Sequence, residues 1–295
     1  MLAVKNLKSD SNIFGHDAWL MGTQFEISVV ADDAVRAGEQ INAAIAEINR
    51  VERLLSGLTD NSQVNEINRN AGIKPVKVDA EIFRLIDRAL QISELMHGTF
   101  DITYVADKST ESRSTHNNYK NVILDEVNVT VFLKDKNMRI SLASLSKGYA
   151  TDRAKYALQL AGVSSGVINA DGSLLTWGLQ PNHEPWTIAT ADPLQQNHPY
   201  ANADISNMSI STAVDADKQL AVNKKQSINT KNGFPVSGIM SASVISPTAE
   251  LSGALTAPVI AMGVNASLYL VNKLNQIACV IIDDHNRVYA SKGIK

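Results

Sequence analysis

The chain has 295 residues, 44% of them hydrophobic, and a formal net charge of -3. This composition suits one large domain or two modest ones with a sizeable core, and the scattered basic residues exclude a typical nucleic-acid-binding surface. A single cysteine, Cys279, excludes an intramolecular disulfide, and its apolar neighbours in IACVIID predict a buried side chain rather than a reactive thiol.

The first twenty residues contain no apolar run of signal-peptide length, and no later run reaches the length of a membrane span. We therefore expect no transmembrane segment. The compartment stays open between the cytoplasm, for the chain as written, and the periplasm, if a leader was removed before residue 1.

The N-terminal third predicts one strand and two long helices. Residues 24–30, QFEISVV, alternate as a strand does, and an apolar stripe with helical spacing predicts a helix over residues 32–55. Ser62 is a candidate N-cap for a short helix. A second apolar stripe predicts a helix over residues 78–97 that ends at Gly98.

The next segment predicts extended and looped backbone. Residues 99–103, TFDIT, predict an extended stretch in which the side chains of Asp101 and Thr103 point to the same side. Residues 104–127 are polar and predict a loop. The strand patterns NVTVFLK and MRISLAS then predict a hairpin across residues 135–137.

The central stretch, residues 139–173, predicts a strand, a turn, an amphipathic helix, a second strand and a glycine turn. Lys147 and Gly148 stand where we expect the helix to begin. Unpaired N–H groups and partial positive charge at a helix start suit an anion, although plain capping explains the same residues. The residues at 170–173, ADGS, predict a turn after the buried strand GVINA.

The C-terminal part continues the mixture of strands and helices. SLLTWGL and PWTIATAD predict two strands joined by a turn, residues 209–213 predict another, and residues 192–207 have the composition of a surface excursion. SASVISP predicts a strand that leads into a helix over residues 249–262. Without repeats or a biased linker, this order predicts an α+β fold as a single bilobed unit.

Several of these segments resemble motifs of the ApbE-like FAD:protein FMN transferases. ASLSKGYATD and NADGS resemble the family's GGIAKGYAVD and NAGGD, MGTQFEI resembles MGTxFxI, and TFDIT resembles GxFDxT. The resemblance implies an ApbE-like, T-fold-related sheet with packed helices. It divides the chain into an N-terminal extension, residues 1–17, and a flavin transferase domain, residues 18–295.

The family moves FMN from FAD to a threonine or serine hydroxyl of a partner flavoprotein and releases AMP. The resemblance therefore implies FAD as the bound nucleotide and a flavoprotein as acceptor, and it identifies no catalytic residue. It also implies that eight residues line the nucleotide pocket, with Lys147 in contact with FAD phosphate. These residues are Met21, Thr23, Asp101, Thr103, Ser146, Lys147, Asp171 and Gly172.

Two segments depart from the family pattern. SINTKNGFPV keeps the glycine, proline and valine of HIIDPRTGYPV, but Gln226 and Asn229 stand for its histidine and aspartate. In the family, the helix after VSVTVIAP carries an aspartate and a threonine that help hold Mg2+ on the FAD pyrophosphate, and Gly253 and Ala257 stand at those positions here. Neither side chain can bind a metal ion.

Other oxygens near this helix are weak substitutes for the missing metal ligands. Thr256 is one residue away from the threonine position and points about 100° away around a regular helix. Asp171 or Asp152 could supply a carboxylate ligand from another segment of the chain, although each is more simply explained as a solvated residue.

Three functions stay open. The chain is an active flavin transferase with relocated ligands, a flavin-binding protein without transfer, or a pseudoenzyme that serves as a partner subunit or binds another ligand. KGYATD, TFDIT and MGTQF favour the first two. The missing metal ligands favour the last two.

Overall fold

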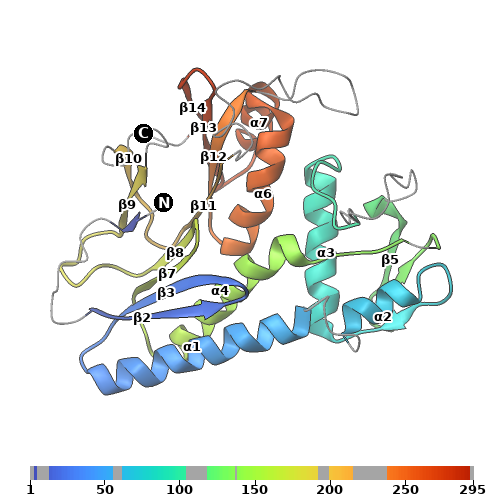
Figure 1. The fold of residues 1–295 in the computed structure, drawn as a ribbon, viewed down its shortest axis with the longest axis horizontal. Coiled ribbons are helices and arrows are strands. Elements are labelled where there is room, and N and C mark those ends of the chain that lie inside the picture. Colours follow the sequence, from blue (N-terminus) through green and yellow to red (C-terminus); the bar gives the residue numbers. More distant parts are fainter. Residues whose placement is uncertain are drawn as a thin grey trace. The chain divides into compact units, whose positions relative to one another are not determined.

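The computed structural model describes residues 3–4, 13–55, 62–103, 118–136, 138–191, 199–214 and 238–292. The chain forms two compact units, one of Met1–Asn49 with Lys147–Lys295 and one of Arg50–Ser146 (Figure 1). Each unit combines helices and antiparallel strands, so the predicted α+β class is confirmed. The chain passes between the units inside helices α1 (Ala34–Leu55) and α4 (Ala143–Leu160).

The larger unit is built on an eight-stranded antiparallel sheet with the order β14-β13-β12-β11-β8-β7-β3-β2. Its strands are β2 (Ile13–Leu20), β3 (Thr23–Val30), β7 (Gly166–Ala170), β8 (Ser173–Trp177), β11 (Ser209–Val214), β12 (Ile239–Ser246), β13 (Ala278–Asp283) and β14 (Val288–Ala290). A second sheet contains β1 (Ala3–Val4), β9 (Thr187–Ala191) and β10 (Pro199–Asp204). Because β2 starts at Ile13, the predicted extension of residues 1–17 ends inside a strand.

The core of the larger unit follows the sequence pattern. In β3, the alternate residues Phe25, Ile27 and Val29 are fully buried, as the period of a strand requires. Helix α1 forms where it was predicted, and the Asp33 carboxylate caps it by accepting a hydrogen bond of 2.9 Å from the Arg36 N–H. Its buried stripe consists of Ala37, Ile41, Ala44 and Ile48 in the larger unit, and continues with Val51 and Leu55 in the smaller one.

Helix α6 (Ala249–Met262) occupies the predicted range and packs on β11 and β12, and α7 (Val264–Val271) follows it. Helix α6 also contacts α4 at Gly148. A Cβ atom placed there would lie 2.6 Å from the carbonyl carbon of Ala249 and 2.7 Å from the Cα of Glu250. Only glycine allows this approach of the two helices.

The smaller unit contains α2 (Gln63–Arg69), α3 (Ala80–Leu95), the short 3-10 helix η1 (Tyr119–Asn121), and a sheet of the order β4-β6-β5. The strands are β4 (Val76–Lys77), β5 (Val122–Asp125) and β6 (Thr130–Leu133). Ser62 is the predicted N-cap, since its hydroxyl accepts from the Asn65 N–H at 3.1 Å. Helix α3 begins two residues later and ends two residues earlier than predicted, and Gly98, at φ 77°, lies in the turn that follows it.

Near the centre of the chain, some predictions were wrong. MRISLAS forms no strand, and α4 already begins at Ala143, so Lys147 lies in its second turn and not at its start. SLLTWGL and PWTIATAD form strands β8 and β9 as predicted, and these strands belong to different sheets. The expected excursion at residues 192–207 includes β10, and residues 192–198 lie outside the described part.

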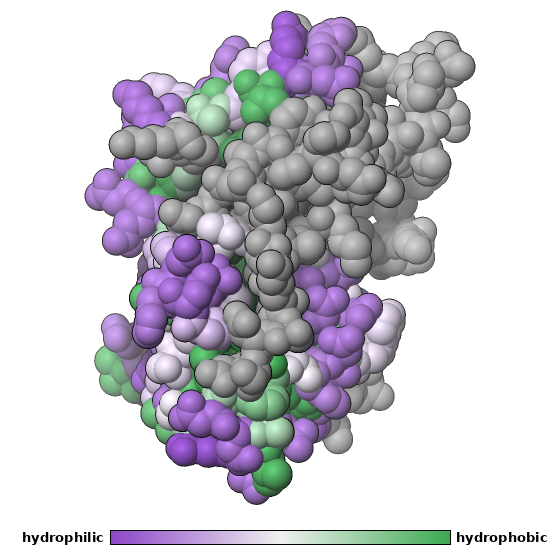
Figure 2. Space-filling view, turned by 90° about the vertical axis from the view of Figure 1, so that its left-hand side faces the viewer, coloured by the Kyte–Doolittle hydropathy of each residue, from purple (hydrophilic) through white to green (hydrophobic). Residues whose placement is uncertain are grey.

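Figure 2 shows hydrophilic residues over much of the described surface of one face, with hydrophobic residues among them. Among the described residues, no helix combines the length and the apolarity needed to cross a bilayer.

Cys279 is fully buried in β13, as predicted, and burial raises the pKa of its thiol to about 11.

Candidate functional site

Two tight turns lie side by side at the ends of two neighbouring strands of the large sheet. Strands β3 and β7 pair antiparallel, so the turn before β3 and the turn after β7 lie at the same end of the pair. All four turn residues have positive φ: Met21 at 52°, Gly22 at 74°, Asp171 at 41° and Gly172 at 86°. Aspartate is one of the few residues besides glycine that adopt this conformation readily.

Hydrogen bonds join these turns to one another and to α4. The Thr23 hydroxyl donates to the Asp171 carboxylate at 2.9 Å, and the Lys147 ammonium donates to the Asp171 backbone carbonyl at 3.1 Å. The carbonyl oxygen of Gly172 accepts from the Thr212 N–H of β11 at 2.9 Å. Five of the eight predicted pocket residues are therefore brought together: Met21, Thr23, Lys147, Asp171 and Gly172.

This group offers a cationic contact in a defined position. An ammonium has three N–H donors, and the bond to the Asp171 carbonyl uses one of them. The half-buried Lys147 can turn its other donors toward the oxygens of a phosphate. The Asp171 carboxylate, which would repel an anion, is turned to the Thr23 hydroxyl.

Asp101, Thr103 and Ser146 belong to the smaller unit. The expected extended backbone at Asp101 is wrong, because its carboxylate accepts from the Thr103 N–H at 2.8 Å and from the Thr103 hydroxyl at 2.7 Å. This closes a turn, and Thr103 is fully buried. The second carboxylate oxygen accepts from the Tyr119 N–H at 3.1 Å. The Ser146 hydroxyl donates to the Ala143 carbonyl within α4.

The face of α6 at the two family metal positions carries no oxygen. A Cβ atom added at Gly253 would meet nothing within 4 Å, and Ala257 is exposed. The hydroxyl of Thr256 is buried and donates to the Ser252 carbonyl at 2.6 Å, so it points into the packed side of the helix. In the described ranges, no three His, Cys, Asp or Glu side chains are grouped to hold a metal ion. These residues do not fit a bound Mg2+.

The carboxylate of Asp152 is also engaged. Its two oxygens accept hydrogen bonds of 2.8 Å from the backbone N–H groups of Ala249 and Glu250, at the start of α6. Burial raises the pKa of Asp152 to about 6, the two hydrogen bonds oppose that rise, and the charge of Glu250 adds to it. Asp152 is thus a helix cap between α4 and α6.

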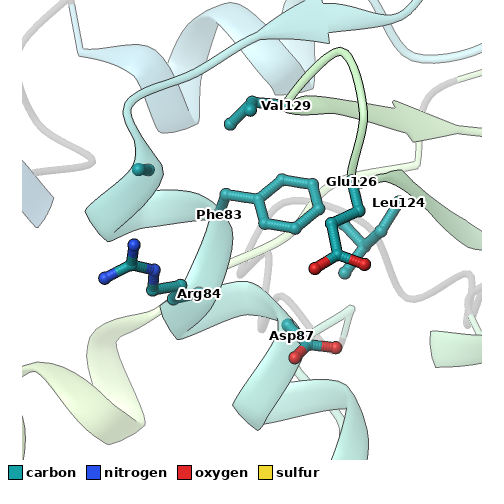
Figure 3. Close-up of a pocket in the computed structure, with 7 residues that line it drawn as sticks. Phe83, Arg84, Asp87, Leu124, Glu126 and Val129 are labelled. Carbon is teal, nitrogen blue, oxygen red and sulfur yellow. The ribbon is translucent and has the colours of Figure 1, made fainter.

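The smaller unit has a hollow that the sequence did not predict. Its volume is about 460 Å³ and it lies between α3 and the β5–β6 hairpin. Figure 3 shows the Phe83 ring between helix and hairpin, with the carboxylates of Asp87 and Glu126 on one side of it. The sequence analysis predicted only the apolar stripe of this helix. The lining residues are Ala80, Phe83, Arg84, Asp87, Leu124, Glu126 and Val129.

Two predicted segments fall partly or wholly outside the described residues. The loop predicted over residues 104–127 is not described at residues 104–117, and its later part forms η1 and β5, so the prediction is wrong there. The segment from Gln226 to Val236 that resembles HIIDPRTGYPV is not described, and its alignment with the family stays a prediction.

Comparisons with known proteins agree with this fold. The ApbE family profile matches residues 21–281. An FAD:protein FMN transferase of Klebsiella pneumoniae (strain 342) is 24% identical over 304 residues, which cover 96% of this chain and 93% of that protein. One from Haemophilus influenzae is 20% identical over 97% of this chain and 91% of its own length.

Solved structures with a similar fold cover almost the whole chain. The ApbE protein of Thermotoga maritima superposes with a TM-score of 0.78 at 21% identity, covering 95% of this chain and 97% of that one. The flavin transferase ApbE of Vibrio cholerae also gives a TM-score of 0.78, at 18% identity and with the same coverage. The similarity confirms the predicted ApbE-like fold.

Proposed function

The chain belongs to the ApbE family, and on this premise we propose that it binds FAD and transfers FMN from it to a threonine or serine hydroxyl of a partner flavoprotein. The observation that carries the proposal is the arrangement of Lys147 and Thr23 around the Asp171–Gly172 turn. These residues come from three distant segments and present a lysine ammonium at the end of two strands.

The proposed reaction exchanges the phosphoanhydride bond of FAD for a phosphoester bond to the acceptor. The acceptor hydroxyl oxygen attacks the phosphorus of the FMN half of FAD, the bond from that phosphorus to the bridging oxygen breaks, and AMP leaves with that oxygen. The hydroxyl proton is lost to solvent. Negative charge grows on the phosphate oxygens as this happens, so a fixed cation nearby lowers the barrier.

In this chain, Lys147 is the residue proposed to supply that cation. Its bond to the Asp171 carbonyl directs the ammonium at the turn, and the bond from Thr23 keeps the Asp171 carboxylate from folding back on it. The tight turns leave little side-chain bulk there, since Gly172 carries none. The phosphate would therefore approach backbone and ammonium together.

A second function is favoured by a specific observation on α6. The positions that carry metal ligands in the family are Gly253 and Ala257 here, and the described residues contain no group of three His, Cys, Asp or Glu side chains that could hold a metal ion instead. A divalent cation typically contributes several kcal/mol to the transition state of such transfers. The chain is then a flavin-binding protein that holds FAD without transferring FMN, or transfers it slowly.

The two functions are separated by titrating FAD into the protein with and without Mg2+ and then measuring AMP release with a threonine-bearing family acceptor peptide. Release at ordinary enzymatic rates supports the transferase, and binding without release supports the flavin-binding protein. If calorimetry detects no FAD binding at high micromolar concentrations, both are wrong.

Matched variants test the role of the lysine. Lys147→Ala should weaken FAD binding about 10-fold to 100-fold, because a charged hydrogen bond to phosphate is lost. Lys292→Ala removes an exposed lysine of the same unit and should leave binding unchanged. Equal affinities of the two variants would contradict the assignment of Lys147.

A further inference from the structure

The contacts around the candidate site form a closed circuit. On one side, Lys147 of α4 donates to the carbonyl of Asp171 at 3.1 Å. On the other side, the next carbonyl in the turn, that of Gly172, accepts from the Thr212 N–H of β11 at 2.9 Å. The turn is therefore held between α4 and β11.

Helix α6 continues the circuit from β11. The buried hydroxyls of Ser209, in β11, and Ser252, in α6, share a hydrogen bond of 2.9 Å. Both serine side chains are fully buried, so this contact is sheltered from water. The position of α6 is thereby coupled to the strand that holds Gly172.

The circuit closes where α6 returns to α4. The Asp152 carboxylate accepts from the N–H groups of Ala249 and Glu250, at 2.8 Å each, and Gly148 lets the two backbones meet one turn earlier along α4. Lys147 and Asp152 are five residues apart on the same helix. Any displacement of α4 at this joint therefore moves Lys147 relative to the turn.

We propose that Asp152 is a positioning residue for the nucleotide site, and that protonation of its carboxylate weakens FAD binding. It closes the α4–α6 joint, which in turn keeps the Lys147 ammonium at the Asp171–Gly172 turn. This rests on the proposed function, in which Lys147 contacts the FAD phosphate.

The proton dependence follows from the surroundings of Asp152. Burial raises the pKa of its carboxyl to about 6, and two charged groups act on it: Glu250 of α6 raises the pKa further, and Lys155, one turn along α4, lowers it. The two N–H hydrogen bonds lower this pKa, so they hold the ionised carboxylate more strongly than the neutral carboxyl. As the pH falls through this value, the protonated oxygen becomes a poorer acceptor. While the carboxyl stays buried, its bonds to the start of α6 therefore weaken and the joint loosens.

The test is an FAD titration at pH 7.5 and at pH 5 with three proteins. The wild type should bind about tenfold more weakly at pH 5. Asp152→Asn should bind weakly at both values, with no pH dependence of its own. Asp33→Ala removes the matched carboxylate cap of α1 in the same unit, outside the circuit, and should keep the wild-type profile.

The results that overturn the inference differ from those that overturn the proposed function. Wild-type protein that binds FAD equally at both pH values, or Asp152→Asn with the wild-type profile, would contradict the role of Asp152. Absence of FAD binding at both pH values removes the proposed function instead.

If the protein does not bind FAD, the backbone amide NMR signals of Ala249 and Glu250 still test the contact between α4 and α6 directly. They should titrate with a midpoint near 6 in the wild type, and removal of the neighbouring positive charge by Lys155→Gln should raise that midpoint. Signals that do not titrate would refute the proton-dependent joint without any reference to FAD.

Discussion

The closest approach of α4 and α6 predicts that alanine at position 148 destabilises the larger unit, although alanine is normally the better helix former. Gly148 lies inside α4, where replacing a glycine by alanine typically gains about 0.5–1 kcal/mol. Here the new methyl group would meet backbone atoms of Ala249 and Glu250, which cannot rotate away. The sign of the usual effect should be reversed.

The magnitude follows from the distances. Ordinary contact starts at 3.4 Å and the added Cβ would lie 2.6 Å from the Ala249 carbonyl carbon, and nearer still to the carbonyl oxygen, so the helices must separate by at least about 0.8 Å. The same shift stretches the 2.8 Å hydrogen bonds of Asp152 beyond useful length. Overpacking costs about 1–3 kcal/mol, and a weakened cap adds about 1 kcal/mol. After the gain in helix propensity, we expect a net loss of about 1–3.5 kcal/mol.

Two other helical glycines provide matched controls. A Cβ at Gly38 in α1, or at Gly253 in α6, would meet nothing within 4 Å, so Gly38→Ala and Gly253→Ala should be neutral or stabilising. Urea unfolding followed by tryptophan fluorescence measures the effect, because all three tryptophans lie in the larger unit. If Gly148→Ala is as stable as Gly38→Ala, the close approach of α4 and α6 is refuted.

Three further predictions concern other sites. Asn68→Ala should destabilise the smaller unit by about 1–3 kcal/mol in thermal melts, because the Asn68 amide forms hydrogen bonds with both the N–H and the carbonyl of Ile140. As a control, Asn70→Ala removes one exposed hydrogen bond and should change the stability by less than about 0.5 kcal/mol. Burial alone would raise the pKa of Asp283, but hydrogen bonds from the turn lower it from 3.8 to about 2. Its ionised form therefore stabilises the fold above about pH 4, this contribution is lost as the pH falls through 2, and Asp283→Asn should flatten this acid limb of the stability curve. Native Cys279 should react with a thiol reagent at least about a hundredfold more slowly than the urea-unfolded chain, since its pKa lies about two units above that of a free thiol; equal rates would show an open β13.

The helix boundaries show how far local signals reach. Helix α6 begins where predicted because Thr248 offers a hydroxyl cap to the Leu251 N–H, and it ends at Gly263. The start of α4 was missed because MRISLAS alternates as a strand does. A strand also needs a free edge to pair with, and β6 is already flanked by β4 and β5. That information is not local, so the sequence pattern alone could not reject the hairpin.

The candidate site divides in the same way. The hydrogen bond from Thr23 to Asp171 joins residues 148 positions apart, and only the family resemblance suggested that they meet. The turn at Asp101 could have been predicted locally, because an aspartate two residues before a threonine competes for the backbone N–H groups of an extended segment. The hollow beside Phe83 was not predicted, because its lining comes from a helix and a hairpin that are separated in the sequence.

The segment KGYATD had suggested a nucleotide motif, yet most of its contacts are structural. Gly148 and Asp152 hold α6 against α4, and Lys147 reaches the turn at Asp171. A chain can therefore keep this motif because its fold depends on it, whether or not FMN is transferred. Retention of the motif supports the family fold and does not distinguish a transferase from a flavin-binding protein.

Variants on the exposed face of α6 can distinguish a transferase from a flavin-binding protein. Space is open at Gly253 and Ala257 is exposed, so Gly253→Asp combined with Ala257→Thr can restore two oxygen ligands without displacing backbone. If only the ligands are missing, the double variant should gain Mg2+-dependent AMP release that the wild type lacks. If it binds FAD and still releases no AMP, the departure from the family lies beyond this helix face, and restored metal ligands alone are not sufficient for transfer.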